Sequence, residues 1–162
     1  MINAIMAIDE NGGTGKNGSL PWPEIKKDFQ WFKDNTVGDI VVMGSNTFLD
    51  PKMPKPLPNR TNIVITSNPS KCPKAHSYIS GDIKSQLLDL EQQNPDKTIW
   101  ILGGANIIYE ALSIIKNFYL SRIPGKFECD TFLDYKQITS SKLFTLLKEE
   151  KFEEVTFQVW TK

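Results

Sequence analysis

Short apolar runs alternate along the chain with segments in which apolar residues recur every three or four positions. Four near-continuous apolar runs lie at residues 2–8, 40–43, 62–65 and 98–102. Such runs are typical of strands that are covered on both faces of a mainly parallel sheet. Near the end of the chain, residues 155–160 show an alternating pattern instead, and residues 119–123 form a plausible neighbouring strand. This pattern predicts antiparallel pairing in the C-terminal part.

Helical spacing predicts four helices, at residues 24–34, 45–47, 82–93 and 105–115. In the third, Ile83, Leu87 and Leu90 fall on one face, and Asp82 is placed to cap the first turn. Strands and helices that alternate in this way predict one α/β domain over residues 1–162. We expect a single-domain three-layer sandwich, with a central mixed, mainly parallel β-sheet, helices on both faces and an antiparallel C-terminal hairpin.

The first predicted helix carries a carboxylate inside its apolar arc. At 100° per residue, Ile25, Phe29, Phe32 and Trp31 share one side of the helix, and Asp28 falls among them. Burial of an unpaired carboxylate is costly and raises its pKa. We therefore favour a functional role for Asp28 over the alternative that it only interacts with the helix dipole.

Glycines mark two strand-to-helix junctions, at residues 42–47 and 101–106. Each offers a close backbone approach followed by helix N-terminal amides. Two such junctions in one sheet indicate a phosphate-rich ligand, with ordinary strand-to-helix turns as the alternative.

The long loop at residues 9–23 holds a GxGxxG pattern at residues 13–18. Prolines at positions 21 and 23 prevent a helix from opening at Gly18, so the pattern does not predict a dinucleotide fingerprint. A lid with glycine hinges is the favoured interpretation, and a plain irregular loop is the alternative.

The distribution of charge points to a further candidate binding residue in one segment. The chain has 19 Lys and Arg against 19 Asp and Glu, and this balance gives no support for nucleic acid or a membrane surface as a partner. Residues 51–74, however, contain five basic residues and no acidic one, and prolines stiffen the path to Arg60. Recognition of a carboxylate or phosphate by Arg60 is the specific interpretation, and a solvated basic face is the general one.

Cysteine and histidine usage excludes several kinds of site. Cys72 and Cys129 lie far apart, and His76 is the single histidine, so neither a disulfide framework nor a His-rich metal site is expected. The longest charge-free apolar stretch, residues 99–109, is shorter than the roughly 20 residues that cross a bilayer. The first eleven residues lack the basic region of a signal peptide. We expect a soluble cytoplasmic monomer without a metal.

Five short motifs follow one another in a particular order. They are Leu20-Pro21-Trp22, then Asp28 with Trp31-Phe32, then Val42-Met43-Gly44 with Thr47, then Pro56-Leu57-Pro58-Asn59-Arg60, and finally Gly103-Gly104 followed by Asp130-Thr131. In their order, spacing and total length these motifs resemble the dihydrofolate reductase family, from residue 1 to about residue 135. The resemblance implies reduction of 7,8-dihydrofolate to 5,6,7,8-tetrahydrofolate by NADPH, with hydride transfer to pteridine C6 and protonation at N5.

The resemblance also implies roles for individual residues. Asp28 would hydrogen-bond the pteridine and favour protonation at N5, and Ser121 would hold Asp28 where the family has a Thr. Trp22 would organise ordered water, and Leu20 would belong to a lid over the nicotinamide. Arg60 would pair with the α-carboxylate of the glutamate tail. The implied substrate-binding residues are Ile5, Ala7, Asp28, Phe32, Thr47, Leu57, Arg60 and Ser121. The implied cofactor-binding residues are Ala7, Thr14, Gly15, Gly18, Ser19, Leu20, Gly44, Ser45, Asn46, Thr47, Thr66, Ser67, Leu102, Gly103, Gly104, Ala105, Asn106 and Ile107.

The sequence departs from the family pattern on the cofactor side. Where the family commonly has basic residues, this chain has Ser45, Asn46 and Asn106, so a preference for NADPH over NADH would need Lys71 or another base. Ungapped spacing places Ile108 where the family has a Tyr, and Tyr109 follows one residue later.

Two other functions remain as alternatives. A pyrimidine reductase of the riboflavin pathway shares the fold, but residues 20–22, Asp28 and residues 57–60 suit a folate better. A non-catalytic folate- or nucleotide-binding structural module is the second alternative, against which the retained Asp28, Ser121 and Thr47 argue. Dihydrofolate and antifolate-type small molecules are the expected ligands.

Overall fold

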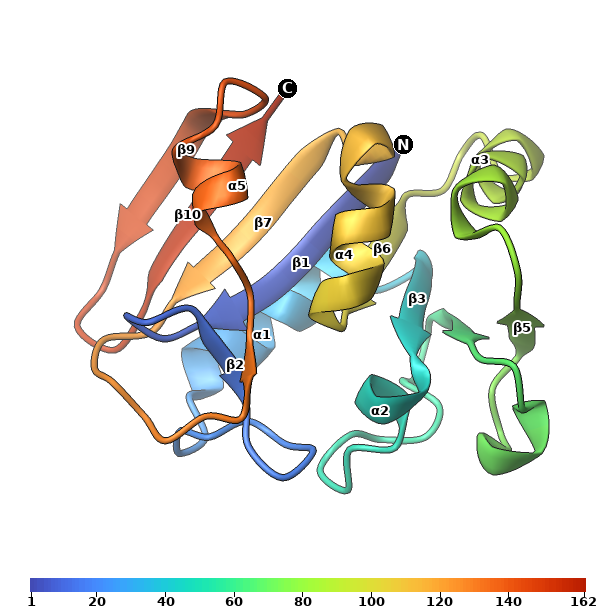
Figure 1. Ribbon diagram of the computed structural model, residues 1–162, viewed down its shortest axis with the longest axis horizontal. Coiled ribbons are helices and arrows are strands. Elements are labelled where there is room, and N and C mark those ends of the chain that lie inside the picture. Colours follow the sequence, from blue (N-terminus) through green and yellow to red (C-terminus); the bar gives the residue numbers. More distant parts are fainter.

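The computed structural model describes residues 1–162, and an eight-stranded mixed sheet forms its centre (Figure 1). Its strands are β1 (Ile2–Ile8), β3 (Ile40–Gly44), β4 (Thr61–Ile65), β5 (Ser77–Ile79), β6 (Ile99–Gly103), β7 (Asn117–Arg122), β9 (Thr145–Lys151) and β10 (Thr156–Thr161). The order across the sheet is β5-β4-β3-β6-β1-β7-β10-β9. All pairs from β5 to β7 are parallel, whereas β10 is antiparallel to both β7 and β9. The predicted mixed, mainly parallel sheet is confirmed.

The C-terminal pairing follows the predicted neighbours, since Val159 of β10 lies opposite Tyr119 of β7. Two sheet strands were not predicted. β5 has three residues, and every residue of β9 is exposed, so neither carries a readable apolar pattern. A separate small sheet pairs β2 (Gly13–Gly15) with β8 (Thr131–Phe132). β2 lies inside the segment that was predicted to be an irregular loop.

Helices cover both faces of the sheet, with α1 behind it and α3 and α4 in front (Figure 1). Their bounds are α1 (Lys26–Thr36), α2 (Ser45–Phe48), α3 (Ile83–Gln93), α4 (Ala105–Ala111) and α5 (Lys136–Thr139), with 3-10 turns η1 (Pro69–Lys71) and η2 (Leu112–Ile114). Asp82 caps α3 as predicted, with its Oδ1 accepting from the Ser85 N–H at 3.4 Å. α1 begins later than predicted because Ile25 has extended backbone.

Alternate residues of the central strands belong to two apolar clusters, one on each face of the sheet. Val42 and Ile101 belong to the larger cluster, which also contains Ile108 of α4. Their chain neighbours Val41 and Trp100 belong to the second cluster, on the side of α1. Because successive side chains of a strand point to opposite faces, a sheet covered on both faces needs apolar residues at consecutive positions. This explains the near-continuous apolar runs.

The apolar arc of α1 is narrower than the sequence predicts. Phe29 is 42% exposed, so its assignment to the buried arc is wrong. Trp31 lies inward and stacks on Phe157 of β10 at 4.4 Å between ring centroids. Asp28 is buried, as predicted.

No helix of the structure combines the length and apolar character needed to cross a membrane. No group of three or more His, Cys, Asp or Glu side chains is arranged to hold a metal ion.

Candidate functional site

A cavity of about 960 Å³ lies across the carboxyl ends of β1, β3, β4 and β6. Ligands of open α/β sheets bind in the crevice at this edge. The structure places all but three of the predicted cofactor-binding residues around the cavity, and the exceptions are Thr66, Ser67 and Gly103. The lining residues that the sequence did not assign to the cofactor are Met6, Asn17, Leu49, Asp50, Pro51, Ile65, Asp130, Thr131 and Phe132, of which Asp130 and Thr131 belong to the last family motif. Several of these belong to segments that are adjacent to the cavity only in the folded chain.

The loop at residues 9–23, which was interpreted as a lid, is held against the segment around β8. Asp130 donates its backbone N–H to the Gly15 carbonyl at 2.9 Å, and its Oδ2 accepts from the Asn17 N–H at 2.9 Å. Thr14 Oγ1 donates to Thr131 Oγ1 at 3.1 Å. The lid is therefore ordered against residues that are more than 100 positions away in the sequence.

A buried carboxylate anchors the base of this lid. Asp9 accepts the backbone N–H groups of Asn11 and Gly13 at 2.8 Å and of Phe127 at 2.9 Å, and Cys129 Sγ lies 3.6 Å away. Burial raises the pKa of Asp9, but these donors outweigh it and lower the pKa below its usual value. Sequence reasoning missed this anchor because no local pattern pairs residue 9 with residue 127.

Gly13 is required by packing at this anchor rather than by a hinge. A Cβ at this position would collide with Cys129 Sγ and lie 3.1 Å from Asp9 Oδ1. The backbone of Gly13 also pairs with Phe132 in the small sheet. The glycine therefore permits the close approach of two loops.

Asp28 and Ser121 form a buried pair between α1 and β7. Ser121 Oγ donates to Asp28 Oδ1 at 2.6 Å, and Ser121 lies opposite Ala7 of β1 in the parallel register. Burial raises the pKa of the Asp28 carboxyl, and the hydrogen bond from Ser121 offsets part of that rise. The arrangement gives a carboxyl group that holds its proton to a higher pH than an exposed Asp does.

Apolar side chains connect this pair with the cavity. Trp22 is buried and packs edge-on against Phe127 at 5.9 Å between ring centroids. Leu20 and Ala7 pack against the same cluster, and both also line the cavity. Of the four predicted catalytic residues, Leu20 lines the cavity itself, whereas Trp22, Asp28 and Ser121 lie outside its lining.

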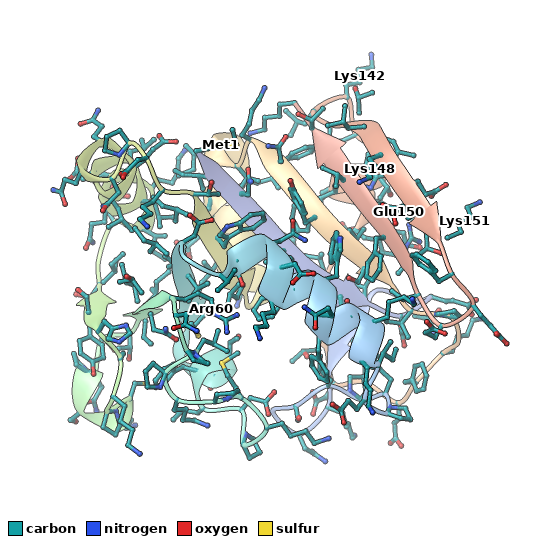
Figure 2. All side chains as sticks on the ribbon, turned by 180° about the vertical axis from the view of Figure 1, so that it is seen from behind. Met1, Arg60, Lys142, Lys148, Glu150 and Lys151 are labelled. Carbon is teal, nitrogen blue, oxygen red and sulfur yellow. The ribbon has the colours of Figure 1, made fainter.

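Arg60 is held at a defined place, as the proline-rich segment predicts. It lies beside the C-terminal end of α1 in Figure 2, where its Nη1 donates to Thr36 Oγ1 at 3.0 Å. Its Nε donates to the Pro58 carbonyl at 2.9 Å, and its guanidinium carbon is 5.7 Å from the centre of the Phe32 ring. Leu57 belongs to the adjacent apolar cluster together with Ile5, and Phe32 packs against that cluster.

The loop that carries Leu57 and Arg60 is clamped by one buried side chain of β4. Asn62 Oδ1 accepts from the Leu57 N–H at 2.9 Å, and Asn62 Nδ2 donates to the carbonyls of Leu57 and Arg60, each at 3.0 Å. The backbone N–H of Asn62 donates to His76 Nδ1 at 2.8 Å. A polar residue at the start of an apolar run is the sequence signal that could have identified this clamp.

Tyr109 does not line the cavity. Its hydroxyl accepts the backbone N–H of Asp134 at 2.7 Å, and Ile107 lines the cavity instead. The side chain of Tyr109 thus serves the contact between α4 and the segment before α5.

Known proteins resemble this chain over its whole length. Residues 1–161 match the family described as dihydrofolate reductase. The chain is 30% identical over 181 residues to dihydrofolate reductase of Bos taurus, covering 99% of this chain and 97% of that protein. It is 37% identical over 143 residues to dihydrofolate reductase of Drosophila melanogaster, covering 81% of this chain and 78% of that protein.

A solved structure agrees with these sequence matches. Dihydrofolate reductase from Enterococcus faecalis, complexed with NADP(H) and RAB-propyl, superposes with a TM-score of 0.79 at 26% identity, covering 99% of this chain and 95% of that one. The chain belongs to the dihydrofolate reductase family.

Proposed function

We propose that the cavity and the adjoining Asp28 form the active site in which this chain reduces 7,8-dihydrofolate to 5,6,7,8-tetrahydrofolate with NADPH. Family membership and the NADP(H) complex of the Enterococcus faecalis relative support the reaction and its cofactor. The observation that carries the site assignment is the buried Asp28, whose Oδ1 accepts a hydrogen bond from Ser121, a residue paired in the sheet with the cavity-lining Ala7.

The residues around the cavity fit a nicotinamide dinucleotide. Ser45, Asn46 and Thr47 follow the end of β3 and offer neutral hydroxyl, amide and backbone N–H groups. Ser19 also lines the cavity, and its buried Oγ has no hydrogen-bond partner in the protein. When bound, NADPH supplies the hydride. The protein side chains orient the two reactants and keep water away from them.

In this proposal Asp28 binds the pteridine and favours its protonation. Ser121 occupies Oδ1, and Oδ2 receives no hydrogen bond from the protein, so Oδ2 is free to accept N–H groups from the pteridine. The ionised carboxylate favours a protonated partner beside it, and because burial raises its pKa, Asp28 can itself hold a proton at a higher pH than an exposed Asp does. Leu20, Trp22 and Ala7 provide the apolar surroundings that favour hydride transfer over reaction with solvent.

Arg60 and the cluster beside it suit the remaining part of a folate. Ile5, Phe32 and Leu57 offer apolar surface for the aromatic ring, and the fixed guanidinium of Arg60 offers charge-assisted hydrogen bonds to a carboxylate. Thr47 lines the cavity, whereas Arg60 and this cluster lie outside its lining. Antifolate-type molecules with a similar ring and amidine edge would bind in the same place.

We further propose that the protein acts as a monomer and that residues 1–162 form a single domain. Asp28, Ser121, Arg60 and the cavity all belong to the same chain. The zero formal charge disfavours a nucleic-acid partner. Two free cysteines favour a reducing, cytoplasmic location.

The test is turnover by purified protein. NADPH oxidation should depend on added dihydrofolate, and Asp28→Asn should keep NADPH binding while losing most turnover at neutral pH. A pyrimidine substrate of the riboflavin pathway should give no NADPH oxidation. A well-folded protein that binds folate and NADPH without turnover would instead indicate the structural-module alternative.

A further inference from the structure

β5 forms one edge of the central sheet (Figure 1). It has three residues, 77–79, which lie opposite residues 63–65 of β4. Lys74 has a left-handed φ of 79°, so the chain just before β5 does not continue the extended strand. A backbone N–H at the start of β4 that faces this edge therefore needs an acceptor other than a strand carbonyl.

His76 supplies that acceptor with its side chain. The backbone N–H of Asn62, in β4, donates to His76 Nδ1 at 2.8 Å, and the Asn62 carbonyl accepts the His76 N–H at 2.9 Å. Asn62 is completely buried, so its N–H has no access to water in place of the imidazole. Nδ1 accepts only when it carries no proton, which requires a neutral imidazole with its hydrogen on Nε2. The contact therefore depends on the acceptor atom of His76 and not only on its bulk.

The side chain of the same Asn62 holds the loop that carries Arg60. Its Oδ1 accepts the Leu57 N–H, and both hydrogens of its Nδ2 are donated, one to the Leu57 carbonyl and one to the Arg60 carbonyl. Asn62 is thus bonded to the loop by its side chain and to His76 by its main chain. A displacement of Asn62 relative to β5 would move the backbone of Arg60 with it.

Arg60 is sensitive to such a displacement because directional contacts fix its guanidinium. Nε donates to the Pro58 carbonyl at 2.9 Å and Nη1 donates to Thr36 Oγ1 at 3.0 Å. Charge-assisted hydrogen bonds to a carboxylate need a defined donor geometry, and a small displacement weakens them. Neither His76 nor Asn62 lines the cavity, so the consequence of moving them should be confined to the substrate tail.

We propose that His76 is a positioning residue for the substrate tail, because its neutral imidazole, acting through Asn62, keeps Arg60 where it pairs with the α-carboxylate. The inference rests on the proposed role of Arg60 and adds to it a residue that does not touch the substrate. His76 acts on the binding of the glutamate tail and leaves hydride transfer and protonation of the pteridine unchanged.

Two substitutions of His76 separate this role from packing. His76→Leu removes the acceptor, whereas His76→Asn keeps an acceptor oxygen close to the position of Nδ1. Kd values would be measured by fluorescence, without NADPH, for dihydrofolate and for 6-methyl-dihydropterin, which lacks the glutamate tail. His76→Leu should raise the Kd for dihydrofolate by about fivefold or more and keep the Kd for the pterin within about twofold. His76→Asn should restore most of the affinity for dihydrofolate. Equal increases for the two ligands, or no recovery in His76→Asn, would overturn the proposal.

The route through Arg60 is tested in a double variant. In the Arg60→Ala background, His76→Leu should cause little further loss of dihydrofolate binding, because the guanidinium that it positions is absent. A further loss as large as the one measured in the presence of Arg60 would overturn the proposal.

NMR of the wild-type protein tests the contact without any variant. The ¹⁵N shifts of the imidazole should show the Nε2–H tautomer, and the Asn62 amide should exchange slowly with solvent hydrogen. An Nδ1–H tautomer would overturn the proposal.

Turnover is measured separately, so the two proposals can fail independently. Selective weakening of dihydrofolate binding in His76→Leu, in a protein that does not oxidise NADPH, would overturn the proposed function and leave this inference standing. Normal turnover with an unchanged ratio of the two Kd values in His76→Leu would overturn this inference alone. Absence of dihydrofolate binding by folded wild-type protein would overturn both.

Discussion

Substitution of Ser121 by Ala tests how the protein controls the ionisation of Asp28. The hydrogen bond from Ser121 Oγ to Asp28 Oδ1 is buried and measures 2.6 Å. A hydrogen bond to a charged group contributes about 1.5–3 kcal/mol. Because this bond favours the ionised carboxylate and holds its pKa down against burial, its loss makes ionisation harder by on the order of 1.4 kcal/mol, which corresponds to about one pH unit.

The assay is the pH profile of the hydride-transfer rate for wild type, Ser121→Ala and Ser121→Thr. In Ser121→Ala the midpoint attributed to Asp28 should move upward by on the order of one pH unit. Ser121→Thr keeps the hydroxyl and should restore the wild-type midpoint, which a merely structural effect of the serine would not do. A midpoint that stays in place or moves downward in Ser121→Ala would refute the reasoning.

Three further predictions concern stability and the substrate tail. Because burial raises the folded-state pKa of Asp28, the stability of the wild type falls as the pH rises through that pKa. Asp28→Asn should therefore unfold at a higher urea concentration than wild type at pH 7, and this difference should close towards pH 4. The difference in unfolding free energy should be about 1.4 kcal/mol for each unit by which the pKa is raised. Arg60→Ala should raise the KM for dihydrofolate more than for a pteridine without a glutamate tail, and equal changes would remove Arg60 from the substrate site. Asn62→Ala should cost about 2–3 kcal/mol in urea unfolding and raise the same KM. In the double variant with Arg60→Ala, the two KM effects should be less than additive, whereas full additivity would separate the clamp from Arg60.

The apolar pattern predicted six of the eight strands of the central sheet, and it also predicted the burial of Asp28. Consecutive apolar positions predict strands covered on both faces, and the parallel sheet follows from them. Asp28 was identified because a carboxylate among apolar helix positions would be buried, and burial of an unpaired charge costs free energy. The same periodicity wrongly included Phe29 in the buried arc. Helical spacing predicts the direction in which a side chain points, but it does not predict whether another element packs against that side chain.

The unpredicted features depend on contacts between segments distant in the sequence. β9 lies at the edge of the sheet with every side chain exposed, so its strand conformation comes from pairing with β10 rather than from its own pattern. Asp9 was missed because its partner Phe127 lies 118 residues away. Motif matching identifies residues by their place in a family pattern, whereas Asn62, which holds Leu57 and Arg60, belongs to none of the motifs.

Single-turnover hydride transfer across pH tests the central claim most directly, because it isolates the step that Asp28 is proposed to assist. Wild-type protein loaded with NADPH would be mixed with dihydrofolate, and the same measurement would be made with Asp28→Asn. The account predicts that the wild-type rate falls as the pH rises, and that Asp28→Asn is slower by a hundredfold or more at neutral pH and recovers as the solution becomes acidic. Equal rates for the two proteins at neutral pH would contradict it.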